Sequence, residues 1–157
     1  MNKTAFNDLL SKKDGITKGP FGSDIKKSLF IKKEKNAYKV YEQGVVINND
    51  INYGDYYISE DHFKKKLKKF EIKSKDILVT GAGTLGELFI VDKIPHKGVI
   101  NQALIRIRLN ENVISPNFFK YYFKYYIKHV LNKANGNSVI PNLPPIKYIK
   151  KTQIKIP

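Results

Sequence analysis

The most regular hydrophobic pattern lies in residues 115–136, "SPNFFKYYFKYYIKHVLNKANG". Its apolar side chains recur every three or four residues, which is the spacing of one buried face of an α-helix. Ser115 is suited to cap this helix, Pro116 suits its first turn, and Gly136 lies just past its expected end. The pattern predicts a helix with a buried stripe that consists of Phe119, Tyr122, Phe123, Tyr126, Ile127 and Val130.

Three shorter stretches also show helical patterns, residues 4–13, 59–72 and 142–151. The second has the clearest start signal, because Ser59 can cap it and acids follow in its first turn. The side chains that we expect to face the core are Phe6, Leu9 and Leu10 in the first stretch and Phe63, Leu67 and Phe70 in the second.

Alternating or continuous apolar runs predict strands over residues 37–47, 76–80, 87–94 and 98–110, with an extended segment at 152–157. Two segments rich in Gly, Pro, Asn and Asp, residues 14–28 and 48–59, are predicted loops. Helices and strands alternate irregularly, and the strands follow one another too closely for repeated strand–helix–strand units. The sequence therefore predicts an α+β fold.

Residues 81–86, "GAGTLG", match G-x-G-x-x-G, the fingerprint of dinucleotide binding. That fingerprint needs a helix after the third glycine and an acid about 20 residues further on. The segment that follows, "ELFIV", favours a strand, and Arg106 and Arg108 stand near the place where the acid is expected. We therefore interpret the glycines as the turn of a β-hairpin, with Thr80 and Thr84 near its tip.

The net charge of the chain gives the first indication of its function. It carries 29 basic and 14 acidic residues, a net charge of +15, which favours a polyanionic partner and above all nucleic acid. Nearly all the basic residues are Lys, and Asn and Ile are abundant, as an AT-rich genome would produce. Such codon bias explains Lys in place of Arg, but it explains less well the twofold excess over acids.

Several classes of site are absent from the pattern. The chain has no Cys, so thiolate zinc sites and disulfides are excluded, and its three His residues show no metal-ligand spacing. We find no catalytic constellation. No apolar run approaches the ~20 residues of a membrane span, and the N-terminus lacks the apolar region of a signal peptide. A single-domain, non-enzymatic cytoplasmic protein is expected.

Four parts of the chain carry a family pattern. They are the Gly-rich loop "GPFGSDIKKSLF" (19–30), the stretch "YYISEDHFKKKLKKFEIKSKDILVTGAGTLGELFIVDK" (56–93), "INQALIRIRLN" with "FFKYYF" (100–110 and 118–123), and the closing "GNSVIPNLPPIKYIKKTQIKIP" (136–157). In this order and spacing, they resemble the target recognition domain of the DNA specificity subunit of type I restriction–modification enzymes. The resemblance covers nearly the whole chain.

The resemblance implies a curved mixed or antiparallel sheet with a few packing helices, formed by residues 1–157 as one target recognition domain. It implies sequence-specific binding of double-stranded DNA at one half of a bipartite site, without chemistry or a cofactor of its own. Partner methyltransferase and restriction subunits would use S-adenosylmethionine, or ATP and Mg²⁺. A second target recognition domain is expected, in the same subunit or through dimerisation. The family's spacer coiled-coil helix, expected after Pro157, is missing from this sequence.

Candidate DNA contacts follow from side-chain chemistry and expected loop positions. The base-reading candidates are Ser23, Thr80, Thr84, Asn101, Gln102, Arg106, Arg108, Asn135, Asn137 and Ser138. The phosphate candidates are Lys18, Lys26, Lys27, Lys64, Lys65, Lys66, Lys147, Lys150 and Lys151. Both arginines can instead lie on the solvated face of a strand. Residues that distinguish one target from another are expected in the segment 37–57.

An alternative is a non-specific module for single-stranded DNA or RNA, which would stack bases on aromatic side chains. The ten Tyr and nine Phe residues permit it. Most of them cluster on the stripe of the 115–136 helix, where core packing is the expected role.

Overall fold

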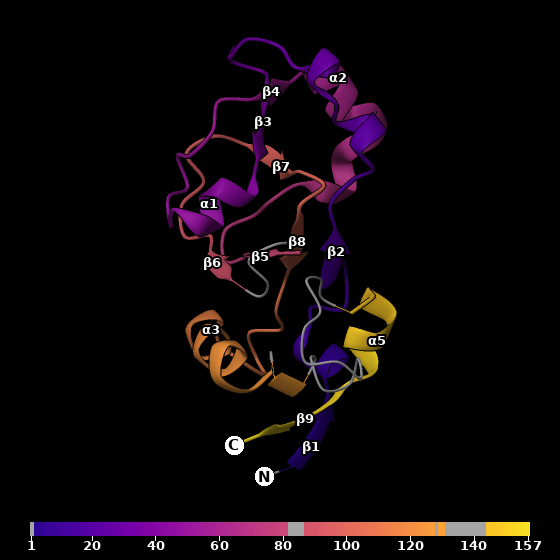
Figure 1. The fold of residues 1–157 in the computed structure, drawn as a ribbon, viewed down its shortest axis with the longest axis vertical. Helices are drawn as coiled ribbons and strands as arrows, with labels where there is room; N and C mark the ends of the chain where they lie inside the picture. The colour runs from indigo at the N-terminus through magenta and orange to yellow at the C-terminus, as the bar shows by residue number, and fades with distance from the viewer. Residues whose placement is uncertain (1, 82–86, 128, 131–143) are drawn as a thin grey trace.

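The computed structural model describes residues 2–81, 87–127, 129–130 and 144–157 (Figure 1). Its central sheet has four antiparallel strands in the order β2-β8-β5-β6. These strands are β2 (Ile16–Lys18), β8 (Leu104–Ile107), β5 (Ile77–Thr80) and β6 (Leu88–Ile90). All the residues of β5 and β8 are buried, because both strands are covered on their two faces.

Two smaller sheets lie at the ends of the molecule (Figure 1). One has the order β4-β3-β7, with β3 parallel to β7, and is formed by β4 (Tyr57–Ile58), β3 (Tyr38–Tyr41) and β7 (Gly98–Ile100). The other joins the two ends of the chain through the antiparallel pair β1 (Asn2–Ala5) and β9 (Gln153–Ile156). The four-stranded sheet therefore connects a terminal region to a distal region.

Short helices cover these sheets. They are α1 (Gln43–Ile47), α2 (Glu60–His62), α3 (Pro116–Tyr122) and α5 (Ile146–Lys151). Helix α2 continues as a π-helix (Phe63–Leu67) and a 3-10 turn (Lys68–Phe70), and α3 continues as a π-helix (Phe123–Ile127). Further 3-10 turns span Phe6–Leu9, Gly22–Asp24 and Lys27–Leu29.

Several expectations from the sequence are confirmed. The hydroxyl oxygens of Ser59 and Ser115 accept backbone N–H groups at the starts of α2 and α3, at 3.1 and 3.2 Å. The predicted hairpin forms as the antiparallel pair β5–β6. In the stripe on α3, Phe119, Phe123 and Ile127 are buried, and the other three members pack against the same core. The α+β class is confirmed as well.

Other expectations are wrong in their local geometry. Residues 4–13 contain the end of β1 and one 3-10 turn in place of a helix, although Phe6, Leu9 and Leu10 are buried as expected. The pairing of β1 with β9 explains the difference, because it holds the start of this segment extended. Ile16–Lys18, in a predicted loop, forms β2 because it pairs with β8.

The second half of the predicted strand 37–47 is helix α1. Packing decides this, since Val45 and Val46 join a core with Tyr41, Leu78 and Ile100. The ring of Tyr53 lies where a side chain on Gly44 would stand, so the glycine admits that ring against the helix.

Candidate nucleic-acid interface

The connector between β7 and β8, residues 101–103, is where several distant segments meet. The predicted strand 98–110 breaks here, since β7 belongs to the three-stranded sheet and β8 to the four-stranded one. The N–H of Gly81, at the edge of the hairpin turn, donates to the carbonyl of Ala103 at 3.0 Å. The N–H of Asn101 donates to the carbonyl of Tyr41 at the end of β3, at 2.9 Å. The connector thus joins the hairpin to the segment that leads into α1.

The Gly-rich loop 19–30 also rests on this connector. The N–H of Gly19 donates to the carbonyl of Leu104 at 2.9 Å. A Cβ on Gly19 would overlap the carbonyl oxygen of Asn101, so this close approach requires glycine. The side-chain oxygen of Asn101 accepts the N–H of Ala103 at 3.0 Å and holds the turn. Its side-chain amide nitrogen makes no hydrogen bond with a described residue, and so remains open to a ligand.

A cavity of about 280 Å³ opens where the loop, the connector and the segment after β3 meet. It is smaller than the usual pocket for a drug-sized ligand, about 300–1,000 Å³. Its lining combines positive, amide and aromatic side chains with one carboxylate. The lining residues are Gly22, Ile25, Lys26, Lys27, Phe30, Val40, Glu42, Tyr56, Asn101 and Gln102.

Contacts of Asp24 and Ile25 hold the Gly-rich loop against the rest of the fold. Ile25 is buried in a core with Val40, Ile58 and Phe63. A ring nitrogen of His62 lies 2.6 Å from the carbonyl oxygen of Asp24, which ties the loop to α2. The exposed side chains of this loop, such as Ser23, Lys26 and Lys27, are therefore carried by a backbone that is held in place.

Two aromatic features mark the rim of this loop. The rings of Phe30 and Tyr56 pack with centroids 4.7 Å apart. Phe21, immediately before the 3-10 turn Gly22–Asp24, is 84% exposed. The Phe21 ring therefore lies outside the core, next to the cavity-lining Gly22, where it is accessible to a ligand.

Charge at the cavity has both signs. Lys26 and Lys27 are exposed. Burial raises the pKa of the Glu42 carboxyl, and Lys39 and Lys27 offset this shift only partly. The buried Lys39 donates to the carbonyl of Asn52 at 3.1 Å, and burial lowers its pKa.

The predicted base-reading residues do not all gather here. Asn101 and Gln102 line the cavity, and Ser23 is exposed on the neighbouring turn. Thr80 is fully buried, and its hydroxyl lies 3.4 Å from the carbonyl oxygen of Glu87, its acceptor, so it supports the hairpin. Four other candidates lie outside the described residues, namely Thr84, Asn135, Asn137 and Ser138.

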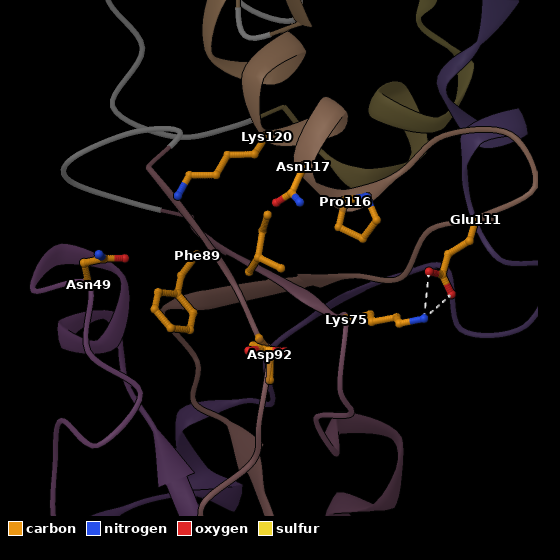
Figure 2. A pocket seen from close by; sticks show the side chains of 10 residues that line it. Asn49, Lys75, Phe89, Asp92, Glu111, Pro116, Asn117 and Lys120 are labelled. Carbon is orange, nitrogen blue, oxygen red and sulfur yellow. Dashed lines mark hydrogen bonds and ion pairs between the residues drawn. The ribbon is translucent and has the colours of Figure 1, made fainter.

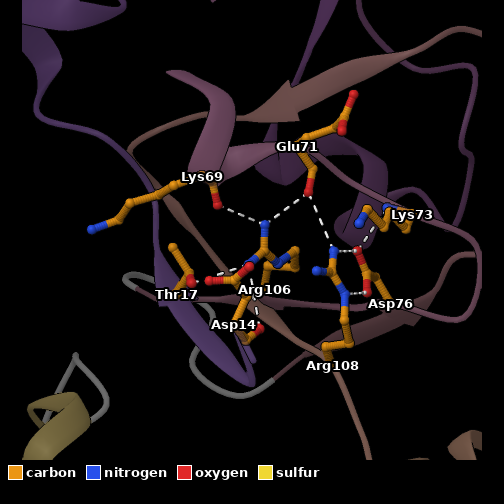
Figure 3. Close-up of polar contacts among 8 residues, drawn as sticks. All are labelled: Asp14, Thr17, Lys69, Glu71, Lys73, Asp76, Arg106 and Arg108. Atoms are coloured by element: carbon orange, nitrogen blue, oxygen red, sulfur yellow. Dashed lines mark hydrogen bonds and ion pairs between the residues drawn. The ribbon is translucent and has the colours of Figure 1, made fainter. Parts of the chain in front are cut away.

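Arg106 and Arg108 lie in a buried polar network (Figure 3). Arg106 is only 1% exposed, so the alternative of a solvated strand face does not hold for it. Its Nη1 donates to the carbonyls of Lys69 and Glu71 at 2.8 and 2.7 Å. Its Nη2 donates to the hydroxyl of Thr17 at 3.1 Å. These bonds tie the segment after α2 to the four-stranded sheet and remove Arg106 from the groups able to reach a base.

Arg108 is paired in the same network. Its Nε and Nη2 donate to the two carboxylate oxygens of Asp76 at 2.7 and 2.8 Å, and Asp76 also accepts the N–H of Lys73 at 2.7 Å (Figure 3). This bidentate ion pair raises the pKa of the Arg108 guanidinium. Arg106, in β8, and Arg108, directly after it, therefore both hold the fold together.

The phosphate candidates occupy three places. Lys26 and Lys27 lie at the cavity, and the exposed Lys18 ends β2, one residue before the loop. Lys64 and Lys65 form ion pairs with Glu60 and Asp61 at 2.7 and 3.0 Å, which reduces their attraction for phosphate.

Lys147, Lys150 and Lys151 lie on α5, beside the terminal strands and far from α2 (Figure 1). They line a separate open groove with Asp8. The structure therefore separates these lysines from the cavity at the connector.

A larger cavity of about 550 Å³ lies between β6 and α3 (Figure 2). Lys75 and Glu111 form an ion pair at one side, with their atoms 3.1 Å apart. Lys120 and Asn117 reach it from α3. None of the individually predicted contact residues lines it.

The sequence did not indicate Glu42 and Tyr56, which line the cavity at the connector, or the exposed Phe21, which precedes the cavity-lining Gly22. Glu42 and Tyr56 fall within the segment 37–57, where target-distinguishing residues are expected. The extreme exposure of Phe21 depends on the neighbours of its loop, which a single sequence does not reveal.

Among the described residues, no three His, Asp or Glu side chains gather where they could hold a metal ion. None of the helices in the described part of the chain is both long and apolar enough to cross a membrane.

Comparison with known proteins adds a family and a fold. The model for the "Type I restriction modification DNA specificity domain" matches residues 21–157. No curated protein matches the sequence.

Three solved structures share the fold. A chain from a study of complex assembly and conformational transition of the type I R-M system has a TM-score of 0.60 and 12% identity, with 98% of this chain and 33% of that chain covered. The type I restriction-modification S subunit from M. genitalium has a TM-score of 0.56 and 13% identity, with 97% of this chain and 33% of that chain covered. The HsdS subunit from Thermoanaerobacter tengcongensis has a TM-score of 0.60 and 11% identity, with 97% of this chain and 32% of that chain covered. The present chain thus spans about a third of their length.

Proposed function

The chain belongs to the type I restriction modification DNA specificity domain family, and we propose that it binds double-stranded DNA and reads one half of a bipartite target site. The observation that carries this proposal is the convergence at residues 101–103. Two predicted phosphate contacts, Lys26 and Lys27, and two predicted base contacts, Asn101 and Gln102, line one cavity there.

Lysines supply the sequence-independent part of the affinity. Lys18, Lys26 and Lys27 are exposed at or near the cavity, and each phosphate that they neutralise releases counterions. Binding should therefore weaken steeply as salt rises. Lys66, exposed on the helix tied to the loop and without an ion pair among the described residues, can extend this contact.

Side chains on the loops supply the sequence-dependent part. Gln102 is exposed and has both a donor and an acceptor, as bidentate contact with adenine requires. Asn101 offers its amide nitrogen, and Ser23 offers a hydroxyl. Phe21 stands out from the loop, where an aromatic ring can contact the methyl group of thymine.

The proposed role involves no chemistry by this chain. Methyltransferase and restriction subunits would carry S-adenosylmethionine, ATP and Mg²⁺, and the chain would bring them to the target. The second half-site would be read by another target recognition domain, in the same subunit or in a dimer. Two linked half-sites would raise affinity through effective concentration, so the chain alone should bind more weakly than a full subunit.

A selection from random duplex DNA at two salt concentrations tests the proposal. A short motif of a few base pairs should be enriched, and total binding should fall at the higher salt. Equal recovery of all sequences at both salts would contradict sequence reading. The same pool as single strands serves as control, since preference for single strands would favour stacking on exposed rings such as Tyr121 and Tyr125.

A further inference from the structure

Glu42 is the one acid among the described residues that line the cavity at the connector. It lies with Lys26 and Lys27 in a chain whose net charge is +15. A carboxylate there repels phosphate and weakens non-specific DNA binding. Its presence calls for a role other than phosphate contact.

The backbone around Glu42 leaves space for its carboxylate. Glu42 is extended, with φ −111° and ψ 167°, between β3 and α1. Opposite it, Gly54 has φ +90°, in the left-handed region that favours glycine. A Cβ on Gly54 would lie 2.6 Å from Oε2 of Glu42. The glycine thus leaves the space that the carboxylate occupies.

Neither helix capping nor a hydrogen bond accounts for this carboxylate, although the charges of Lys39 and Lys27 attract it. Glu42 is the N-cap residue of α1, yet its side chain accepts no capping hydrogen bond. Only its backbone carbonyl is used, by the N–H of Val45 at 3.0 Å. Within the described part of the chain, the carboxylate makes neither a hydrogen bond nor an ion pair. Both oxygens are left to accept from a ligand.

We propose that Glu42 is a specificity-determining residue that accepts a hydrogen bond from the exocyclic amino group of a base, N4 of cytosine or N6 of adenine. This inference rests on the proposed function of duplex reading. An ionised carboxylate can only accept, so it pairs with an amino group and is repelled by O6 of guanine or O4 of thymine. The negative charge of Glu42 weakens phosphate binding, but it discriminates against bases that present an oxygen at this position.

The neighbouring side chains fit the same base edge. Gln102 and Asn101 line the same cavity from the connector, and the side-chain amide nitrogen of Asn101 has no hydrogen bond with a described residue. Lys26 and Lys27 line the same cavity as Glu42, so they can hold a phosphate near the carboxylate. The cavity volume of about 280 Å³ suits the edge of one base better than a cofactor.

The test compares random-duplex selections for the wild type, Glu42→Ala, Glu42→Gln and Glu34→Gln. Glu34 is exposed and outside the cavity, so Glu34→Gln makes the same charge change elsewhere. We expect wild type and Glu34→Gln to enrich one motif with cytosine or adenine at a defined position. Glu42→Ala should lose about tenfold in preference at that position alone, and the near-isosteric Glu42→Gln should relax it.

A base-analogue cycle identifies the amino group. Purine in place of adenine, or 2-pyrimidinone in place of cytosine, should weaken wild-type binding about tenfold and leave Glu42→Ala unchanged. Identical motifs and preferences for wild type and both Glu42 variants would overturn this inference and leave the proposed function intact. A wild-type chain that enriches no motif would overturn the proposed function, and this inference with it. Circular dichroism confirms that each variant is folded.

Discussion

Gly19 and Asn101 lie 82 positions apart in the chain, yet the Cα of Gly19 approaches the carbonyl oxygen of Asn101 too closely for any side chain. This approach seats the Gly-rich loop on the connector between β7 and β8. The loop brings Lys26 and Lys27, and the connector brings Asn101 and Gln102, to one cavity. A backbone contact thus sets the spacing of the proposed phosphate and base contacts.

Gly19→Ala should separate the two segments. The added methyl group would overlap backbone, which cannot move as a flexible side chain does, so we expect a loss of about 1–3 kcal/mol in the free energy of unfolding. DNA affinity should fall further than stability alone explains. Gly22→Ala, in the same loop, is the matched control, because a Cβ there meets nothing within 4 Å. Equal behaviour of the two variants would refute the role of the close approach.

Lys26→Ala should change the salt dependence of duplex binding. Loss of one phosphate contact reduces the slope of log affinity against log salt by about 0.9. The effect should be the same on selected and scrambled duplexes, since phosphates carry no sequence information. Lys120→Ala, exposed on α3 beside the other cavity, should leave the slope unchanged. A slope that changes with Lys120→Ala and not with Lys26→Ala would place the DNA on the other surface.

Asp76→Asn should destabilise the fold. Asp76 is buried and its carboxylate accepts from Nε and Nη2 of Arg108, so neutralising it leaves the guanidinium without its counter-charge. We expect a loss of about 3 kcal/mol in denaturant unfolding. Glu111→Gln breaks the exposed pair with Lys75 and should change stability by less than about 1 kcal/mol. Similar losses for the two variants would show that the Arg108–Asp76 pair is no more important than a surface pair.

Glu42 should make stability depend on pH. Burial raises the pKa of its carboxyl in the folded chain, so the folded state binds this proton more tightly than the unfolded state. Ionisation therefore costs stability as pH rises above the ordinary carboxyl pKa. Glu42→Gln should be more stable than wild type at neutral pH, and this gain should vanish below that ordinary pKa. Thermal unfolding across this range measures it; a variant less stable than wild type at neutral pH would contradict the account.

Local patterns predicted the elements whose contacts are local. The stripe on α3 and the caps of Ser59 and Ser115 follow from spacing along one helix, and they are confirmed. The break at residues 101–103 was not predictable in this way, because β7 and β8 pair with strands distant in sequence. α1 was missed for a related reason, since its valines are placed by a distant core.

The candidate site shows the same division. Side-chain chemistry pointed to Lys26, Lys27, Asn101 and Gln102, and the structure brings them together. Arg106 has suitable chemistry for guanine, but carbonyls from residues 69 and 71 use its guanidinium. Glu42 was not predicted for two reasons. The chain is basic, so positive side chains were the expected contacts, and Glu42 lies in a segment that the sequence predicts to be a strand.

The most direct test of the central claim is an amide NMR titration of the 157-residue chain with the duplex enriched by selection. The account predicts that the largest shifts occur at residues 19–30 and 101–103. Amides of α5, which lies apart from the cavity, should shift much less. A scrambled duplex should shift the lysine-bearing loop but leave Asn101 and Gln102 nearly unchanged. Largest shifts on α5 or α3, with the loop and connector unaffected, would contradict the account.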